Sequence, residues 1–232
     1  EKVLNETFSI EKKGLIPDTK WKKNNLGKGW VIGETLITGI GQGYTQTTPL
    51  QLCQMTAQLA NGGFKIYPKI IVEEDSKTAE EIRIIMNENR KQLNKKDSGL
   101  KDTTEELLGF LDKKEHETLF KSSKNINLVR EAMFASTNEI RGTSYKSRIE
   151  DPKYQFAGKT GTSQVRRITK AARELDLSTS EIPYNERDHA LYIAFGPYKN
   201  PRYALSIVIE HGGSGSSAAA PMAKKLFKLI ID

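Results

Sequence analysis

The stretch YQFAGKTGTSQVRR, residues 154–167, places a lysine, three hydroxyl groups and a glycine in the five consecutive residues Lys159 to Ser163. Apolar residues lead into this group and arginines follow it. A group of this kind has three candidate chemistries: a phosphate-binding loop, a nucleophile with its base, or a strand edge that binds a ligand. The neighbouring sequence bears on each of them.

A phosphate-binding loop does not fit this stretch. Such a loop has several glycines before its lysine and a helix after it, whereas only Gly158 directly precedes Lys159 and the flanks are strand-like. Two other segments are rich in glycine. Residues 37–44 lack the dinucleotide-binding spacing. Residues 211–217 precede a predicted helix, where free amides would suit an anion, but a tight strand-to-helix turn explains them as well.

The second candidate chemistry is a serine nucleophile with a neighbouring base. A Ser-x-x-Lys pair places a hydroxyl and an amine one helical turn apart, so that the amine accepts the serine proton. Ser9 and Lys12 have this spacing, but they lie in turn-rich sequence, so the match is interpreted as chance. A G-x-S-x-G elbow, typical of Ser/His/Asp hydrolases, is absent from the sequence.

The remaining interpretation is a strand edge. Alternation along a strand places Lys159 and Gly161 on one face, and Thr160 and Thr162 on the other. Lys159 would supply positive charge, Gly161 would leave room for a substrate backbone, and the two threonine hydroxyls would hold a carboxylate. Such an edge is suited to binding an extended peptide as an added strand. The triplet Lys-Thr-Gly is by itself a weak signal.

The last third of the chain predicts an antiparallel sheet. Residues 154–165 are expected to form one strand, and residues 189–198 and 202–212 are nearly continuous apolar runs separated by a short turn. This spacing is typical of a hairpin. Because apolar residues occupy both faces of these runs, helices are expected on each side of the sheet.

Helices are predicted before and after the strands, while residues 1–46 read as turn-rich. Thr48 and Gln51 form a capping box around Pro49, and the helix that they begin ends at Asn61. A further helix is expected over residues 127–136, and the last one begins at Ser216 or Ser217. The apolar faces predicted for the first and last helices are Leu52, Met55 and Leu59, and Leu226, Leu229 and Ile230, respectively.

Composition limits the classes of function. The chain has 232 residues, 37% hydrophobic residues, a mean hydropathy of −0.56 and a net charge of +7. One cysteine and three scattered histidines predict no disulfide and no metal site, and no cofactor is indicated. The charge would suit a polyanion or a carboxylate-bearing substrate, but no basic patch with interleaved aromatic residues points to nucleic acid. Residues 73–121 are nearly all charged and are predicted to be a solvated insertion.

Several segments together resemble one family. AGKTGTSQV, preceded by NLVREAMFAS and IRGTSY, is similar to the third catalytic motif of class B penicillin-binding proteins of the penicillin-binding protein 2 type, which are peptidoglycan D,D-transpeptidases of cell elongation. The resemblance continues, in the family's order, through KKGLIPDTKW, GETLITGIGQGYTQTTPLQLCQMTAQLANGG, DHALYIAFGPY and PRYALSIVIEHGGSGSSAAAP. It covers nearly the whole chain except residues 73–121.

The resemblance implies a mixed α/β (α+β) fold, a partial penicillin-binding transpeptidase of β-lactamase-like type with an antiparallel sheet flanked by helices. Residues 1–232 would be the C-terminal part of that domain, with residues 73–121 inserted in it. The family's Ser-x-x-Lys and Ser-x-Asn motifs should precede the segment that begins at Lys13. The sequence Ser123-Lys124-Asn125 spells the second motif in the wrong place. We therefore expect the nucleophile outside this chain, and the chain alone to be inactive and poorly folded.

The resemblance also implies roles and partners. Lys159 would polarise the site and maintain its proton network, while Thr160, Gly161 and Thr162 would bind the substrate. The ligands would be peptidoglycan stem peptides and β-lactams, and the partner a membrane glycan polymerase of the elongation machinery. The protein would act at the periplasmic face of the bacterial inner membrane, with its anchor outside this chain. The alternative is a non-catalytic, split or degenerate module that acts as a cell-wall scaffold.

Overall fold

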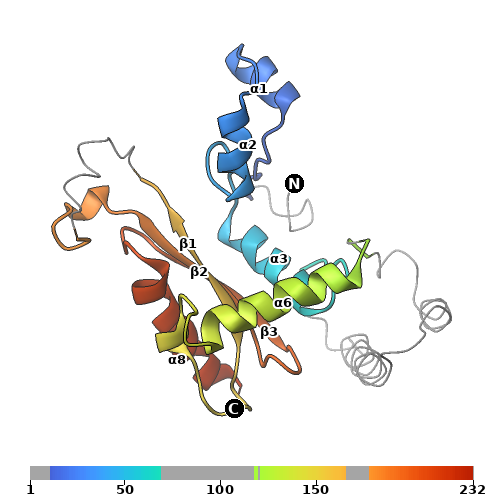
Figure 1. Cartoon of the computed structure of the whole chain (residues 1–232), viewed down its shortest axis with the longest axis vertical. Coiled ribbons are helices and arrows are strands. Elements are labelled where there is room, and N and C mark those ends of the chain that lie inside the picture. The colour runs from blue at the N-terminus through green and yellow to red at the C-terminus, as the bar shows by residue number, and fades with distance from the viewer. Residues whose placement is uncertain (1–10, 69–117, 120, 166–177, 232) are drawn as a thin grey trace.

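The structure is a computed structural model, and it describes residues 11–68, 118–119, 121–165 and 178–231 (Figure 1). Ser9 and nearly all of the insertion predicted at residues 73–121 lie outside the described residues. Besides the helices and strands introduced below, two short 3₁₀ turns occur at Tyr145–Ser147 (η1) and Tyr184–Glu186 (η2).

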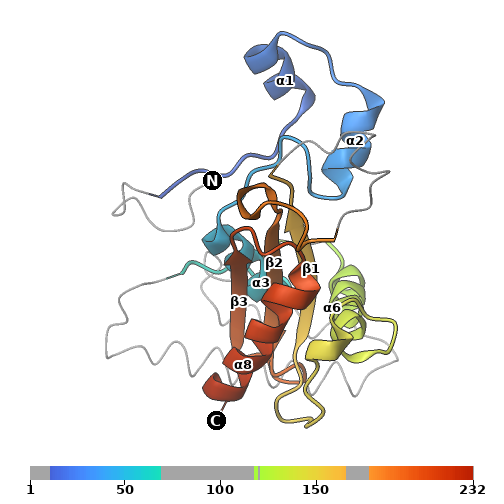
Figure 2. The same cartoon turned by 90° about the vertical axis from the view of Figure 1, so that its left-hand side faces the viewer.

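Three antiparallel strands form the sheet, in the order β1-β2-β3. Strand β1 spans Ala157–Ser163, β2 spans His189–Gly196 and β3 spans Tyr203–Ile209. The predicted hairpin and the predicted strand at residues 154–165 are confirmed, the latter with narrower bounds. Figure 2 shows β1 at the side of the sheet nearest to α6.

Helices cover both faces of the sheet, as expected from its apolar strands. On one face lie α3 (Pro49–Ala60), against β3, and α6 (Ser123–Asn138), against β1. On the other face lies α8 (Ala220–Ile230), which crosses the front of the sheet in Figure 2. The core on the α8 side centres on the buried aromatic residues Phe156, Tyr192 and Phe227. The core on the other side joins Ala60, Met133, Ala157 and Phe195.

The predicted sheet-facing side of the last helix is wrong. A π-helical turn, Gly215–Ala219 (η3), precedes α8, and the wider π turn shifts the phase of the residues that follow it. The buried residues of α8 are consequently Ala220, Ala223 and Phe227. The three residues expected there are 38–76% exposed: Leu226, Leu229 and Ile230.

The predicted face of α3 is also wrong in part. The capping box is confirmed, because the Gln51 amide donates to Thr48 Oγ1 at 3.2 Å and the Thr48 amide donates to Gln51 Oε1 at 2.9 Å. However, Met55 is 40% exposed, and the buried residues are Thr56 and Ala60. The Cys53 thiol donates to the Ala204 carbonyl of β3 at 3.5 Å. Small side chains therefore face the sheet, which lets the helix approach the strand closely.

The N-terminal segment contains two short helices that the turn-rich interpretation missed. Helix α1 spans Thr19–Leu26 and α2 spans Ile32–Gly39. The buried Lys22 joins them, with its ammonium 2.5 Å from the Glu34 carboxylate and hydrogen-bonded to the Gly29 carbonyl at 2.7 Å. Short local contacts of this kind carry no periodic apolar pattern, so the sequence did not reveal them. Figures 1 and 2 show both helices at one end, away from the sheet.

Helix α2 presents apolar side chains to the surroundings. None of its residues is buried, and four large apolar residues at or near it are 57–84% exposed: Val31, Ile32, Leu36 and Ile40. Apolar surface gathered in this way marks an interaction site in soluble proteins. No described residue covers this face.

Gly158 of β1 has no side chain, and this leaves room for the ring and hydroxyl of Tyr192, which comes from the neighbouring strand β2. A methyl group at Gly158 would overlap the Tyr192 hydroxyl, which is fully buried. We therefore expect Gly158→Ala to destabilise the domain by about 1–3 kcal/mol, the usual cost of overpacking. Denaturant unfolding of the full-length polypeptide measures this. The control is Gly29→Ala, where a methyl group would meet nothing within 4 Å. Equal stability of the two variants would contradict the prediction.

Candidate functional site

Residues Lys159–Ser163 are the last five of the seven residues of β1, which is an edge strand among the described residues. Helix α6 closes the first half of the outer edge: the Asn138 amide donates to the Phe156 carbonyl at 2.9 Å, and the Thr137 hydroxyl lies 3.5 Å from the Gly158 carbonyl. Backbone groups of an antiparallel strand alternate between its two sides. The amides of Thr160 and Thr162 therefore point to the same outer edge, beyond the reach of these α6 contacts.

The Lys159 side chain lies along this edge. It is exposed, and its ammonium donates to the Thr160 carbonyl at 2.8 Å and to Thr160 Oγ1 at 3.4 Å. The register places Lys159 opposite Ile193 and Thr160 opposite Tyr192, so the predicted alternation of faces is observed. A positive charge and a hydroxyl thus meet at an accessible strand edge, an arrangement that suits an anionic group.

A second hydroxyl, which sequence reasoning missed, stands beside Thr160. Thr143 Oγ1 is 3.3 Å from Thr160 Oγ1 and 3.2 Å from Ser136 Oγ. Thr143 is exposed, so this row of hydroxyls is open to a ligand. The only signal in the sequence is its place in IRGTSY, 17 residues from Thr160, and no spacing rule predicts contact over that separation.

Beneath this row lies a buried group of three hydroxyls. The Tyr192 hydroxyl is 2.9 Å from Thr137 Oγ1 and 3.0 Å from Ser144 Oγ, and all three residues are at most 1% exposed. Burial raises the pKa of Tyr192, which the hydrogen bonds from Ser144 and Thr137 partly oppose. The phenol therefore stays protonated, and it holds the end of α6 and the segment after it against β1.

There is little room for a side chain at Gly161. A methyl group there would lie 3.3 Å from Cβ of Leu191. The backbone at Gly161 also contacts η3, because a methyl group on Gly215 would come within 2.7 Å of the Gly161 carbonyl oxygen. Because Gly161 and Gly215 lack side chains, the π-helical turn packs closely against the backbone of β1 and β2. The role predicted for Gly161 in substrate binding stays a prediction.

The described residues do not bring a nucleophile to Lys159. The Lys159 ammonium has hydrogen bonds only to Thr160 among them. Ser123 begins α6, whose other end contacts β1, so the Ser-x-Asn sequence there is remote from the site. The lysine and the hydroxyls are therefore one part of a possible active site.

Comparison with known proteins decides the family. The model of the penicillin-binding protein transpeptidase domain matches residues 4–228. The chain belongs to this transpeptidase family. The mixed α/β fold and the resemblance found in the sequence are thereby confirmed.

Relatives of this transpeptidase chain are peptidoglycan enzymes. Peptidoglycan D,D-transpeptidase MrdA of Salmonella typhimurium is 34% identical over 230 residues, which cover 99% of this chain and 31% of that protein. The MrdA of Escherichia coli K12 is 28% identical, over 95% of this chain and 30% of that protein. The chain thus spans about a third of the length of the curated relatives that it matches.

Two solved structures share the fold. Penicillin-binding protein 2 of Pseudomonas aeruginosa, in complex with WCK 5153, has a TM-score of 0.67 and 30% identity, over 99% of this chain and 41% of that chain. The complex of penicillin-binding protein 2 with MreC from Helicobacter pylori has a TM-score of 0.62 and 29% identity, over 95% of this chain and 32% of that one. Within the described part of the transpeptidase chain, no helix combines the length and apolarity needed to cross a bilayer.

Proposed function

We propose that this chain is the C-terminal part of a peptidoglycan D,D-transpeptidase of cell elongation, which carries the Lys-Thr-Gly edge but not the nucleophile. The observation that carries the proposal is the Lys159 ammonium, 2.8 Å from the Thr160 carbonyl and beside two hydroxyls on an open strand edge, in a chain of this family. A serine supplied by the upstream part of the polypeptide is the nucleophile.

The reaction is acyl transfer through the upstream serine. Its oxygen bonds to the carbonyl carbon of the peptide bond before the terminal D-Ala of a stem peptide, and D-Ala leaves as the amine after it takes up a proton. The amine of a neighbouring stem then attacks the ester, which forms the cross-link and releases the serine. With a β-lactam the reaction stops at the ester, because the amine released by ring opening stays attached to the acyl group and does not diffuse away.

Each residue of the edge has a separate task. Lys159 holds positive charge beside the reacting groups and maintains the proton network. The hydroxyls of Thr160 and Thr162 bind the carboxylate of the substrate or the drug, and Gly161 lets the peptide lie close to the strand. The Thr162 amide, which points to the outer edge, donates to the oxyanion. A preorganised donor of this kind typically contributes about 100-fold or more to the rate.

The exposed face of α2 supports an upstream part. Ile32 and Leu36 are 84% and 70% exposed, and the relatives are about three times as long as this chain. The rest of the transpeptidase domain covers this face in the proposal, and residues 73–121 are an insertion in the domain. Stem peptides and β-lactams are the ligands. The place is the periplasmic face of the inner membrane and the partner is a membrane glycan polymerase, with no cofactor and no nucleic acid involved.

Lys159→Ala in the full-length polypeptide should slow acylation by fluorescent penicillin about 100-fold or more, because the variant loses the charge at the reacting centre. Labelling is followed over time on a gel. Lys225→Ala, which removes an exposed lysine from α8, is the matched control and should label at the normal rate. Labelling of the Lys159 variant at the rate of the parent protein would contradict the role proposed for this lysine.

Thr143→Val should slow acylation roughly fivefold, the loss expected for one hydrogen bond of about 1 kcal/mol. Thr143→Ser, which keeps the hydroxyl, should retain the rate. The effect should appear with a penicillin that bears its carboxylate and vanish with its methyl ester, because the hydroxyl row meets the carboxylate. An equal loss with both compounds would show that Thr143 only supports the structure.

The isolated 232-residue chain should take up no penicillin, because it lacks the nucleophile. Its only cysteine, Cys53, reports whether α3 is docked: burial raises the pKa of the thiol, so at pH 8 the docked form holds less thiolate than the unfolded form and alkylates more slowly. With the face of α2 uncovered, we expect alkylation nearly as fast as in denaturant. Stoichiometric penicillin labelling would overturn the assignment of the nucleophile to the upstream part.

A further inference from the structure

A cavity of about 520 Å³ lies between α8 and the segment that leads into β1. Its volume is within the range of small-ligand pockets, roughly 300–1,000 Å³. The segment, residues 148–154, precedes the start of β1, whereas Lys159–Ser163 are the last five residues of the strand. Gly158 and Phe156 are tied to α6 between the two places. The cavity is therefore separate from the Lys159 edge.

The base of the cavity is apolar and anchored in the core. Ile149 is 5% exposed and belongs to the same buried cluster as Phe227. Tyr154 packs against that cluster from the side, and its hydroxyl accepts a hydrogen bond from the Lys153 ammonium at 3.0 Å. These contacts fix both residues, so the cavity has a preformed apolar surface.

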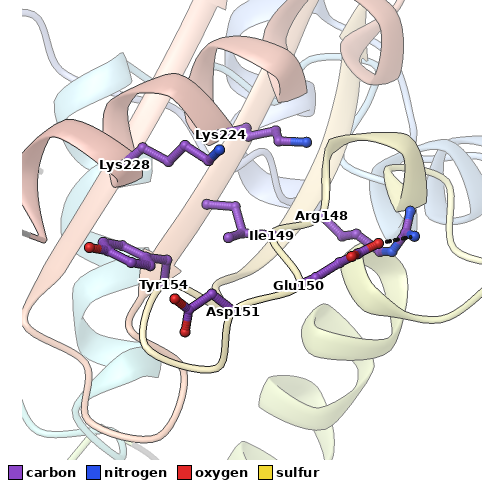
Figure 3. A pocket seen from close by; sticks show the side chains of 7 residues that line it. All are labelled: Arg148, Ile149, Glu150, Asp151, Tyr154, Lys224 and Lys228. Atoms are coloured by element: carbon purple, nitrogen blue, oxygen red, sulfur yellow. Dashed lines mark hydrogen bonds and ion pairs between the residues drawn. The ribbon is translucent and has the colours of Figure 1, made fainter.

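The two walls carry opposite charges. Lys224 and Lys228, one turn apart on α8, lie on one side of Ile149, and Glu150 and Asp151 lie on the other side (Figure 3). Side chains four residues apart on a helix are neighbours, and two like charges there repel. Within the described ranges, neither lysine has a hydrogen bond or an ion pair, and no ion pair crosses the cavity.

The acidic wall is only partly neutralised. Arg148 binds Glu150 at 2.6 Å and stacks on Tyr145 with its guanidinium carbon 4.0 Å from the ring centre. From the described part of the chain, the Asp151 carboxylate accepts one hydrogen bond, from the backbone amide of Lys153 at 2.9 Å. Among the described residues, Asp151 thus has no cation beside its carboxylate, and the two lysines across the cavity have no anion.

We propose that this cavity binds a peptide-like zwitterion, with the ligand's carboxylate at Lys224 and Lys228, its ammonium at Asp151, and its apolar middle on Ile149 and Tyr154. An anion alone would leave Asp151 unpaired, and a cation alone would leave the two lysines unpaired. The identification of the ligand as an unlinked peptidoglycan stem, which carries both kinds of charge, rests on the proposed function. The dipolar recognition itself does not.

Ligand-detected NMR with the full-length polypeptide tests this site without any acylation step. The probes are Ala-Leu-Ala with free termini, its N-acetyl form and its C-terminal amide. The free peptide should bind, and each blocked form should bind more weakly because it has lost one charge. Lys224→Ala combined with Lys228→Ala should weaken binding about tenfold, since two exposed ion pairs are lost. Asp151→Asn should weaken the free peptide and leave the N-acetyl form unchanged.

Lys225→Ala is the matched control, because Lys225 lies between the two lysines in sequence and does not line the cavity; its affinity should equal that of the parent. Equal affinity of all three peptides, or unchanged affinity in the double lysine variant, would overturn the proposal. Inorganic phosphate that binds as tightly as the free peptide would do the same, by showing a simple anion site. Loss of penicillin labelling would concern only the proposed function, because peptide binding is measured separately.

Discussion

The arrangement of the candidate site depends on one buried contact, the hydroxyl of Tyr192 between Thr137 and Ser144. Three segments that are far apart in sequence meet there: the end of α6, the turn after it, and the middle strand of the sheet. A buried hydroxyl without partners is costly, roughly 1–3 kcal/mol, so the three groups hold one another in place. The absence of a side chain at Gly158 is what allows the phenol to reach them.

This contact explains why the edge of β1 has two different halves. Where α6 is held against the strand, the carbonyls of Phe156 and Gly158 receive hydrogen bonds from its side chains. Beyond that point Lys159, Thr160 and Thr162 remain accessible, and the same anchored turn brings Thr143 beside Thr160. The buried hydroxyl contacts of Tyr192 thus hold α6 and the following turn in place, and this in turn positions the accessible hydroxyls of Thr143 and Thr160.

Two parts of the surface remain unmatched in the described residues, and they differ in character. The face of α2 is apolar, so it is suited to a large protein surface, which in the proposal is the rest of the transpeptidase domain. The cavity beside α8 has an apolar base and charged walls, so it is suited to a small dipolar ligand. In both cases the kind of partner is inferred from the polarity and charge of the surface itself, not from similarity to the family.

Local sequence patterns were enough to predict the strands, their pairing and the helices on both faces of the sheet. Apolar runs, short turns and helix caps act between residues that are near neighbours in the chain, so the sequence displays them directly. The family followed from motifs in order along the sequence. The buried faces of α8 and, in part, of α3 could not be predicted in this way: a π-helical turn rotated α8, and close approach to the sheet brought Thr56 and Ala60 of α3 to it instead of Met55. The sequence by itself determined the Lys-Thr-Gly edge strand. Only the tertiary structure decided that Thr143 stands beside it and that Lys224 faces Asp151 across a cavity, because those contacts join residues whose separation follows no local period.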